Sequence, residues 1–390
     1  MYEKYSHSIN NYLNTFLYKK VVFDYKPYLN SDDYSPIKHA LVSYLTKPLI
    51  LPLDKKCFSN NGIATSIPKA LNELGYSVDV VDIHNMDFIP TRQYDLFFGH
   101  VGHNFTHICN HLHSNCIKIS FSPGDHWKFF NTQEEKRFEE LRNRKGITLL
   151  FDRYRYDLET EEKSLLLSDG IVCLGDESVC KPFSDFTNVV HLNNASYPDN
   201  HYDNVDKGFN EGRNNFLFYS GGGNVHKGLD LLLEAFSKTD KHLYICTCLD
   251  SNFKDLYEKE LSQSNIHFMG WVRQRSKKFY QIIDKCNFII FPSCSEGSAG
   301  SVVECMNQGL IPIVSRETRI DVSRFGVFLN ECTIQEIKDK IEYVSALPAS
   351  ELREKSLLTR KVALNEYSEE AFIRNMKACI QKITLASNNS

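Results

Sequence analysis

The chain alternates short apolar segments with longer amphipathic segments along most of its length, and a polar stretch between Asn193 and Asn215 interrupts this pattern. Short apolar runs bounded by turn residues are typical of buried strands, and the amphipathic runs between them are typical of helices. Strands separated by helices form parallel sheets through right-handed crossovers. The polar stretch contains a proline and no periodicity, which is typical of a linker. The sequence therefore predicts two α/β domains.

The expected elements follow from these runs. Before the polar stretch, strands are predicted at 48–52, 76–81, 95–98, 117–121, 147–151, 170–174 and 188–192. After it, strands are predicted at 216–219, 243–248, 266–269, 288–291 and 311–314, with helices near 228–238, 252–264, 276–285 and 299–308. A helix is also expected over 62–75, and residues 350–382 have a helical pattern. Ligands of such sheets bind outside the carboxyl ends of the strands, which places the expected site in a cleft between the domains.

Length and pattern together set the expected domain boundaries. A chain of 390 residues exceeds the ~100–200 residues of one ordinary domain. We expect a first Rossmann-like domain over residues 1–200, which includes an N-terminal extension over 1–45, and a second over 201–365. Residues 366–390 are expected to form a helix that packs back on the first domain. The Tyr- and Phe-rich extension favours a helix plus an edge strand that cap the core, and peripheral association with a membrane surface stays open.

Charge and cysteine usage exclude several classes of protein. A formal net charge of −4 argues against a nucleic-acid partner, because phosphate neutralisation requires a basic excess. The 12 cysteines include no Cys-x-x-Cys pair, which favours reduced thiols in a cytosolic protein over a disulfide framework or a zinc site. The first residues lack the regions of a signal peptide, and no apolar run approaches the ~20 residues of a membrane span. We therefore expect a cytoplasmic protein, with the inner face of a membrane as an alternative location.

The segment from Glu296 to Glu304 carries the most chemical information. Between the two glutamates lies a loop of small residues that leads into a helix ended by Gly309. Small residues let a ligand approach the backbone, and the first helical N–H groups favour an anion such as a diphosphate. Carboxylates suit hydroxyl groups because they are acceptors, with Glu296 at the cleft mouth and Glu304 about two helical turns deeper. Two solvated glutamates on a glycine-rich turn are the alternative. The small residues that we expect to bind the anion are Gly297, Ser298, Ala299, Gly300 and Ser301.

Three spaced motifs resemble the retaining glycosyltransferases of family 4, which have the GT-B fold of two Rossmann-like domains. The segment Tyr219-Ser-Gly-Gly-Gly-Asn-Val-His-Lys227-Gly resembles the family's strand, loop and Lys-Gly pair. Phe268-Met-Gly-Trp-Val272 resembles a strand that ends in an aromatic residue, and Glu296 to Glu304 resembles the Glu-x7-Glu signature. The resemblance covers residues 215–330 well and the first half of the chain only loosely.

This resemblance implies roles for individual residues. Lys227 contacts the donor diphosphate, where a fixed cation stabilises the departing phosphate. Glu296 contacts the donor sugar and Glu304 the ribose. Family members often carry an arginine about five residues before the lysine, where this chain has Gly222. Backbone amides of Gly221–Gly223, or Arg273 or Arg275, are the candidates to replace it.

The first half of the chain supplies further candidates at its predicted loops. Gly62 lies in a segment that resembles the family's glycine loop facing the donor, and a plain helix N-cap turn is the alternative. Asp125 and His126 follow the strand at 117–121, where the family often places a histidine near the donor sugar; loop polarity alone also explains them. His100 lies at a strand's carboxyl end and is expected to line the cleft. His103, His107 and His111 have helical spacing, but apolar residues on the same helix favour a solvated or cleft-edge face over a metal site.

Together these features predict a retaining glycosyltransferase, a hexosyltransferase-like enzyme that moves a sugar from a nucleoside-diphosphate sugar to a glycan, lipid-linked or protein acceptor. The resemblance implies no metal and no other cofactor. The alternatives are a nucleotide-sugar epimerase or hydrolase on the same fold, and a catalytically degenerate nucleotide-binding subunit. The sequence does not specify the donor base, the sugar, the acceptor or the oligomeric state.

Overall fold

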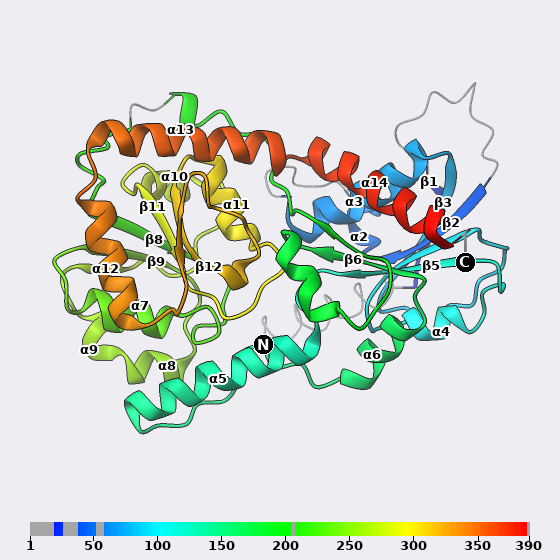
Figure 1. The fold of residues 1–390 in the computed structure, drawn as a ribbon, viewed down its shortest axis with the longest axis horizontal. Coiled ribbons are helices and arrows are strands. Elements are labelled where there is room, and N and C mark those ends of the chain that lie inside the picture. The colour runs from blue at the N-terminus through cyan, green and yellow to red at the C-terminus, as the bar shows by residue number, and fades with distance from the viewer. Residues whose placement is uncertain (1–18, 26–37, 52–57, 205–206, 388–390) are drawn as a thin grey trace, which may run out of the picture.

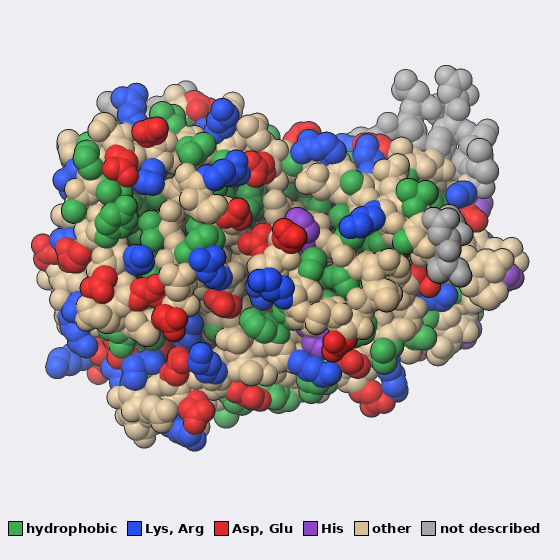
Figure 2. Space-filling view, in the orientation of Figure 1, with side chains coloured by type: hydrophobic (Ala, Val, Ile, Leu, Met, Phe, Trp, Pro, Cys, Tyr) green, Lys and Arg blue, Asp and Glu red, His purple; other side chains and the backbone are tan. Residues whose placement is uncertain are grey.

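The computed structural model describes residues 19–25, 38–51, 58–204 and 207–387. It divides into two halves, each built around one sheet, with long helices that pass from one half to the other (Figure 1). Among the described residues, no helix combines the length and apolar character that a membrane crossing requires. Lys, Arg, Asp and Glu side chains are interspersed over both halves of the face shown in Figure 2.

The first half contains a seven-stranded sheet in the order β1-β3-β2-β4-β5-β6-β7. All neighbouring strands pair in parallel except β1, which pairs antiparallel with β3 at the edge. Edge position and antiparallel pairing confirm the edge strand expected in the N-terminal extension. The strands are β1 (Val21–Tyr25), β2 (Lys38–Tyr44), β3 (Tyr76–Asp82), β4 (Leu96–His100), β5 (Ile117–Ser122), β6 (Gly170–Leu174) and β7 (Val189–Leu192).

Two predicted strands of this half are wrong. The strand predicted at 48–52 is absent over residues 48–51, because Lys47–Ile50 is the short helix α2 with Pro48 in its first turn, a position where proline is tolerated. Residue 52 lies outside the described residues. The strand that lies inside the sheet, between β3 and β4, is β2, and all of it falls within the predicted extension of 1–45. Residues 147–151 form no strand either, and Leu150 is 90% exposed. The remaining part of the extension lies outside the described residues.

The second half contains a six-stranded parallel sheet in the order β10-β9-β8-β11-β12-β13. Numbered from β8, this is the order 3-2-1-4-5-6 of a dinucleotide-binding fold. Successive strands are added on one side of β8 up to β10 and on the other side from β11 onward, so the switch point lies between β8 and β11. Ligands bind at the carboxyl ends of the strands beside this point. The predicted strands are confirmed, and β13 is an addition. They are β8 (Asn215–Tyr219), β9 (His242–Cys246), β10 (Ile266–Phe268), β11 (Phe288–Phe291), β12 (Ile311–Ser315) and β13 (Val327–Leu329).

Helices cover both sheets. The helix α11 (Gly300–Asn307) starts after the small-residue loop, and its apolar residues Val302, Val303 and Met306 are buried in the second core, as their pattern predicts. The other helices are α3 (Ser59–Glu73), α4 (Phe105–Cys109), α5 (Trp127–Lys145), α6 (Leu158–Leu166), α7 (Leu229–Phe236), α8 (Ser251–Leu256), α9 (Glu258–Leu261), α10 (Lys277–Ile283), α12 (Ile334–Ser345), α13 (Ala349–Glu366) and α14 (Glu369–Ser387). Short 3-10 helices cover Glu177–Phe183, Tyr202–Asn204 and Arg316–Thr318.

The last helix, α14, returns to the first half, where it continues the line of α13 across the top of Figure 1. Its buried residues Phe372, Met376 and Ile380 belong to the core of the first sheet. Ile383 packs so closely on β6 that a Cβ at Gly170 would lie 2.5 Å from its Cγ2 atom. A helix distant in sequence therefore completes the first core.

Helix α5 makes the opposite crossing. It begins after β5 in the first half and extends beneath the second half in Figure 1. Phe138 and Leu141 are buried in the core of the second sheet. Arg144 forms ion pairs with the fully buried Asp230 and with Glu234 of α7. The span of 1–200 expected for the first domain therefore contains a helix whose apolar face packs on the second.

Candidate active site

The loops that follow β8 and β11 form the centre of the candidate site. Gly222 and Gly223 have φ angles of 140° and 81°, and Gly228, which precedes α7, has a φ of 75°. Residues with a side chain rarely adopt such angles, so this path requires glycine. A Cβ at Gly222 would meet no atom within 4 Å, so the backbone there is open to a ligand.

Lys227 and Glu296 form the charged pair of this centre. The Lys227 Nζ atom lies 2.6 Å from Glu296 Oε1, which also accepts a hydrogen bond of 2.7 Å from the Ser293 hydroxyl. Both side chains are partly exposed, at 14% and 16%. Burial by itself raises the pKa of Glu296, but the Lys227 ammonium and nearby His226 outweigh it and hold the pKa below its usual value. The carboxylate is therefore ionised and faces a cation that can be shared with an anionic ligand.

The loop before Lys227 is held from the first half of the molecule. Asp152 accepts hydrogen bonds from the backbone N–H groups of Val225 (2.6 Å) and His226 (3.0 Å). The His226 ring is buried, with Nε2 2.8 Å from the Ser295 carbonyl and Nδ1 3.5 Å from Cys294 Sγ. Burial lowers the pKa of His226, but Cys294 and Glu134 outweigh it and raise the pKa to about 10. The glycine-rich loop therefore lies on a charged, buried histidine.

The small-residue loop after β11 is in contact with the first half. A Cβ at Gly297 would lie 2.0 Å from the carbonyl oxygen of Pro123, so only glycine fits here. Ser298 is buried and is bound by Asn194, whose side-chain amide donates to the Ser298 carbonyl at 2.9 Å. Ala299 is buried at the start of α11, Gly300 is exposed and Ser301 is half-buried. Of the predicted anion-binding residues, Gly297, Gly300 and Ser301 remain within reach of solvent.

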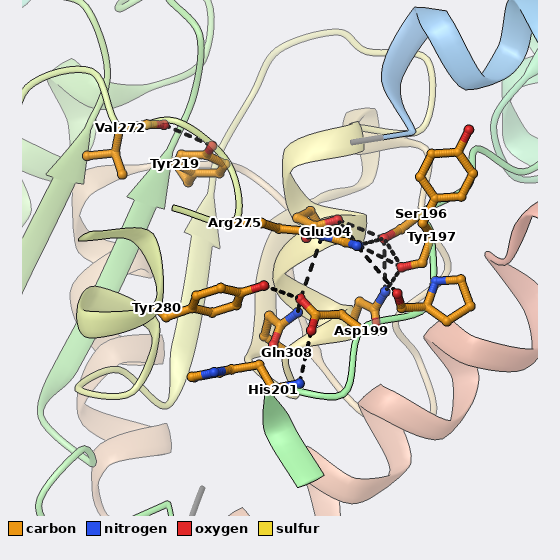
Figure 3. Close-up of polar contacts among 12 residues, drawn as sticks. Ser196, Tyr197, Asp199, His201, Tyr219, Val272, Arg275, Tyr280, Glu304 and Gln308 are labelled. Carbon is orange, nitrogen blue, oxygen red and sulfur yellow. Dashed lines mark hydrogen bonds and ion pairs between the residues drawn. The ribbon is translucent and has the colours of Figure 1, made fainter. Parts of the chain in front are cut away.

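Glu304 lies on α11 but is 1% exposed. Arg275 donates to both of its oxygens, from Nε to Oε1 at 2.6 Å and from Nη2 to Oε2 at 3.0 Å, and the Ser196 hydroxyl donates to Oε2 at 2.7 Å. Figure 3 shows Arg275 extended across Glu304 toward Ser196 and Tyr197. The structure places Arg275 on this carboxylate and not beside Lys227, while Arg273 is exposed.

The polar stretch between the halves contributes the residue that sequence reasoning missed here. Asp199 accepts hydrogen bonds from the Tyr280 hydroxyl (2.6 Å) and the Gln308 side chain (2.8 Å), as Figure 3 shows. Burial raises the pKa of Asp199, but these donors, the His201 amide and Arg275 outweigh it and lower the pKa. The stretch is thus fixed to α10 and α11. Its Asn- and Asp-rich composition is typical of a loose linker and gave no signal of this network.

Asp125 and His126, both predicted site residues, are buried and make contacts that hold the fold together. Asp125 is fully buried and pairs with Arg319, Nη2 to Oδ1 at 2.8 Å, and accepts from the Ser295 hydroxyl at 2.7 Å. Burial raises its pKa to about 6 despite Arg319. His126 is 3% exposed and caps α5, because its Nδ1 accepts from the Lys128 amide at 3.2 Å. Burial also lowers the pKa of His126. Asp125 therefore joins the two halves, and His126 starts a helix.

A cavity of about 600 Å³ opens beside Glu296 and Gly297 and extends to the first sheet. His100 lines it, as its place at the end of β4 predicts, and burial together with His103 lowers its pKa to about 4. Asn60 also lines the cavity, whereas Gly62 is buried: a Cβ there would lie 2.5 Å from the Phe58 ring. The other lining residues are Tyr44, Pro123, Gly124, Phe130, Phe151, Asp152, Arg153, Tyr154, Arg155 and Tyr156.

The segment from Phe151 to Tyr156, called the crossing segment below, supplies most of the cavity wall that sequence reasoning missed. It connects α5 to α6, and its first residue, Phe151, is the last residue of the strand predicted at 147–151. The rings of Phe151 and Tyr154 stack at 4.9 Å, and Tyr156 is 79% exposed. The alternation of arginine and tyrosine from 153 to 156, with no apolar residue between them, is the signal that argues against a buried strand.

The histidine series does not gather around a common point. His103 precedes α4, which covers only five residues, and the centroids of the His107 and His111 rings lie 4.8 Å apart with the ring planes tilted by 51°. Among the described residues, no group of His, Cys, Asp and Glu side chains is arranged to hold a metal ion. The described cysteines are all free thiols.

The second half matches a known family. The model of the glycosyl transferases group 1 family matches residues 203–356, the part of the chain that contains Lys227, Glu296 and Glu304. No curated protein matches the sequence of the chain.

Solved structures with the same architecture include sucrose-phosphate synthase from Thermosynechococcus elongatus, with 12% identity and a TM-score of 0.59 over 89% of this chain and 99% of that one. HepE from Anabaena, in complex with UDP and glucose, has 11% identity and a TM-score of 0.52 over 90% and 100%. TarM from S. aureus has 15% identity and a TM-score of 0.52 over 73% of this chain, which spans only 54% of TarM. These likenesses establish the GT-B fold, and with the family match they support glycosyl transfer as the general activity.

Proposed function

We propose that the protein is a retaining glycosyltransferase that moves a sugar from a nucleoside-diphosphate sugar to a glycan, lipid-linked or protein acceptor. The observation that carries the proposal is the Lys227–Glu296 pair, 2.6 Å apart, at the carboxyl ends of β8 and β11 and inside the region that matches the family model. A fixed cation and a fixed acceptor at this point of the sheet suit a ligand with an anionic and a hydroxylated end.

The two residues then have separate tasks. The diphosphate lies against Gly222 and Gly223, and the Lys227 ammonium stabilises the negative charge that develops on the departing phosphate. Glu296, which is ionised beside Lys227, accepts hydrogen bonds from hydroxyls of the donor sugar. The amides at the start of α11, near Gly300 and Ser301, complete the anion site.

Glu304 serves the ribose side together with Arg275. Because its two oxygens already accept from Arg275 and Ser196, ribose hydroxyls reach Glu304 only when Arg275 turns away from it. We propose that Arg275 leaves this carboxylate, or binds the ribose beside it, when the donor enters.

The acceptor side lies in the cavity next to the first sheet. Retention of configuration follows from a front-face reaction in which the leaving phosphate helps to deprotonate the acceptor, and this requires no protein nucleophile. Of the two carboxylates that line the cavity, Asp152 is occupied by backbone amides and Glu296 is paired with Lys227. His100 faces this space and its low pKa keeps it neutral at physiological pH. We assign the positioning of the acceptor to His100 and not to His126. We assign Asp125 a role in the contact between the two halves and not in proton transfer.

A donor panel tests the proposal and separates it from its alternatives. The protein is incubated with UDP-, GDP- and ADP-sugars, and nucleoside diphosphate release is followed with and without a mixture of glycan acceptors. Transfer predicts release that rises with acceptor and yields a sugar–acceptor product. A hydrolase releases the nucleoside diphosphate without acceptor, an epimerase alters the sugar without release, and a binding subunit does neither.

Matched variants locate the chemistry. Lys227→Ala and Glu296→Gln are each expected to lower the transfer rate about 10²–10³-fold, while Glu139→Gln, on the exposed face of α5, keeps wild-type activity. Transfer that persists at the wild-type rate in both site variants contradicts the assignment of this site.

A further inference from the structure

Lys227 is the cation that the second half of the molecule is seen to place at the glycine-rich loop. Resemblance to family 4 leads one to expect an arginine about five residues before Lys227, and the chain has Gly222 there. Arg275 does not replace it, because its side chain is 6% exposed and bound to Glu304. Arg273 is exposed, and a second positive charge at this loop can come from another element.

Such a charge lies on the crossing segment. A Cβ at Gly223 would be 3.3 Å from Cγ and 3.4 Å from Cδ of Arg153, and 3.6 Å from Cε of Lys227. The aliphatic parts of Arg153 and Lys227 therefore flank the same point of the glycine-rich loop. Arg153 also lines the cavity that contains Glu296 and Gly297.

The backbone of Arg153 is fixed by hydrogen bonds before it and after it, where the Arg155 N–H donates to Asn131 Oδ1 at 3.0 Å. The Arg153 N–H donates to Glu134 Oε1 at 2.6 Å, and the preceding residue, Asp152, accepts from the amides of Val225 and His226. The segment is thus attached to the loop that carries Lys227, although it belongs to the first half of the sequence. A side chain on a fixed backbone needs less ordering to bind a ligand.

The guanidinium itself is uncommitted. Within the described parts of the chain, Arg153 forms no side-chain hydrogen bond and no ion pair, and the residue is exposed. Arg155, two residues on, is by contrast paired with Glu161 at 2.8 Å and bound to the Asp125 carbonyl. An unpaired guanidinium whose aliphatic stem lies at the same point of the glycine-rich loop as the Lys227 stem suits a ligand with more than one negative charge. Its planar fork matches phosphate oxygens.

We infer that Arg153 is the second cation of the diphosphate site, supplied by the first half of the molecule across the cleft. The inference rests on the proposed function and extends it, because it makes donor binding depend on the crossing segment. The donor diphosphate then lies between Lys227 on one side and Arg153 on the other, over the backbone of Gly222 and Gly223.

Calorimetric titration tests this assignment. UDP, GDP and ADP are titrated into the wild-type protein, and the tightest binder is then titrated into Arg153→Ala, Arg153→Lys and, as a control, Arg142→Ala, an exposed arginine of α5. Loss of one charge-assisted contact predicts that Arg153→Ala weakens the nucleoside diphosphate about 10- to 100-fold. Arg153→Lys falls between, since it keeps the charge without the fork, and Arg142→Ala stays within about twofold.

The corresponding nucleoside without phosphates separates a phosphate contact from a damaged loop. Its affinity is expected to be equal in wild type and Arg153→Ala, and the melting temperatures of the two unliganded proteins are expected to agree. Arg153→Ala that binds the nucleoside diphosphate as tightly as wild type, or that loses nucleoside and nucleoside diphosphate equally, overturns the inference. Wild-type protein that binds none of the three diphosphates overturns the proposed function instead, and the inference with it.

Discussion

The two halves of the molecule are built differently. The second sheet takes its strands from one stretch, β8 to β13, and all its neighbouring strands pair in parallel, whereas the first sheet has the antiparallel edge strand β1. In the first half, α14 from the end of the chain packs in the core, and α5 of the first half packs in the core of the second. The strands and loops of the donor side thus come from one stretch of sequence, although α5 and Asp152 of the first half contact them. The acceptor side and the cleft depend on contacts between distant segments throughout.

The largest expected effect concerns α5, the helix of the first half that packs on the second core. Arg144→Ala leaves the fully buried Asp230 without its principal partner. Breaking a buried ion pair costs about 3–5 kcal/mol. Chemical denaturation is expected to show a loss of this size.

The matched control lies on the same helix. Arg142 pairs with Glu139 at the surface, where such pairs contribute about 0–1 kcal/mol, so Arg142→Ala changes the midpoint little. Equal effects of the two variants contradict the docking of α5 on the second core.

The second largest effect is expected from the loss of the Lys227 ammonium, the cation proposed to bind the donor diphosphate. Lys227→Ala removes the charge that faces the departing phosphate, and loss of one such stabilising group costs about 10²–10³ in rate. Transfer rates with the donor identified from the panel measure it, and Lys227→Arg is expected to recover part of the activity. A fully active Lys227→Ala variant places the chemistry elsewhere.

A pH dependence follows from His226. Its folded-state pKa of about 10 lies above the unfolded value of ~6.5. The protonated ring stabilises the fold fully below pH 6.5, and this contribution is lost as the pH rises toward 10. The free energy of unfolding is expected to fall by on the order of 2–3 kcal/mol between pH 7 and pH 9.

The variant His226→Gln isolates this group from the other titrating side chains. Denaturation curves at several pH values are expected to show a smaller decline for it than for wild type. Parallel declines in the two proteins contradict a charged His226 beneath the loop.

The smallest expected effect concerns α14, the C-terminal helix that packs in the first core. Ile383→Val removes one methylene from the contact with Gly170 on β6, and such changes cost about 0.5–1.5 kcal/mol. Leu385→Val on the exposed side of the same helix is the control and is expected to change stability less. A neutral Ile383→Val variant argues that α14 does not complete the first core.

How far the sequence predicts the structure follows the same division. The strands β8 to β12 of the second sheet could be predicted from hydrophobic periodicity, which is local. The two loops that carry Lys227 and Glu296 could be predicted from motif spacing, which is local too. Arg153 and Asp199 could not, since their partners lie far along the chain. Residues 147–151 show the reason: an apolar run predicts burial but does not specify a strand, and here the run leads into a solvent-exposed crossing. Pro48 gave a usable signal for helix α2 that the apolar pattern overrode.

Glu304 gives the same lesson within the signature itself. The resemblance implies that both carboxylates contact the donor, Glu296 the sugar and Glu304 the ribose, yet Glu296 faces the cavity and Glu304 is held by Arg275. Which of the two remains available to a ligand depends on Arg275 and Ser196, whose positions no local pattern specifies.

The most direct test is a crystal structure with the nucleoside diphosphate that binds tightest. The account predicts the diphosphate over Gly222 and Gly223, within hydrogen-bond distance of Lys227 and Arg153, with its nucleoside toward Arg275 and Glu304. A nucleoside diphosphate bound away from the ends of β8 and β11 would contradict it.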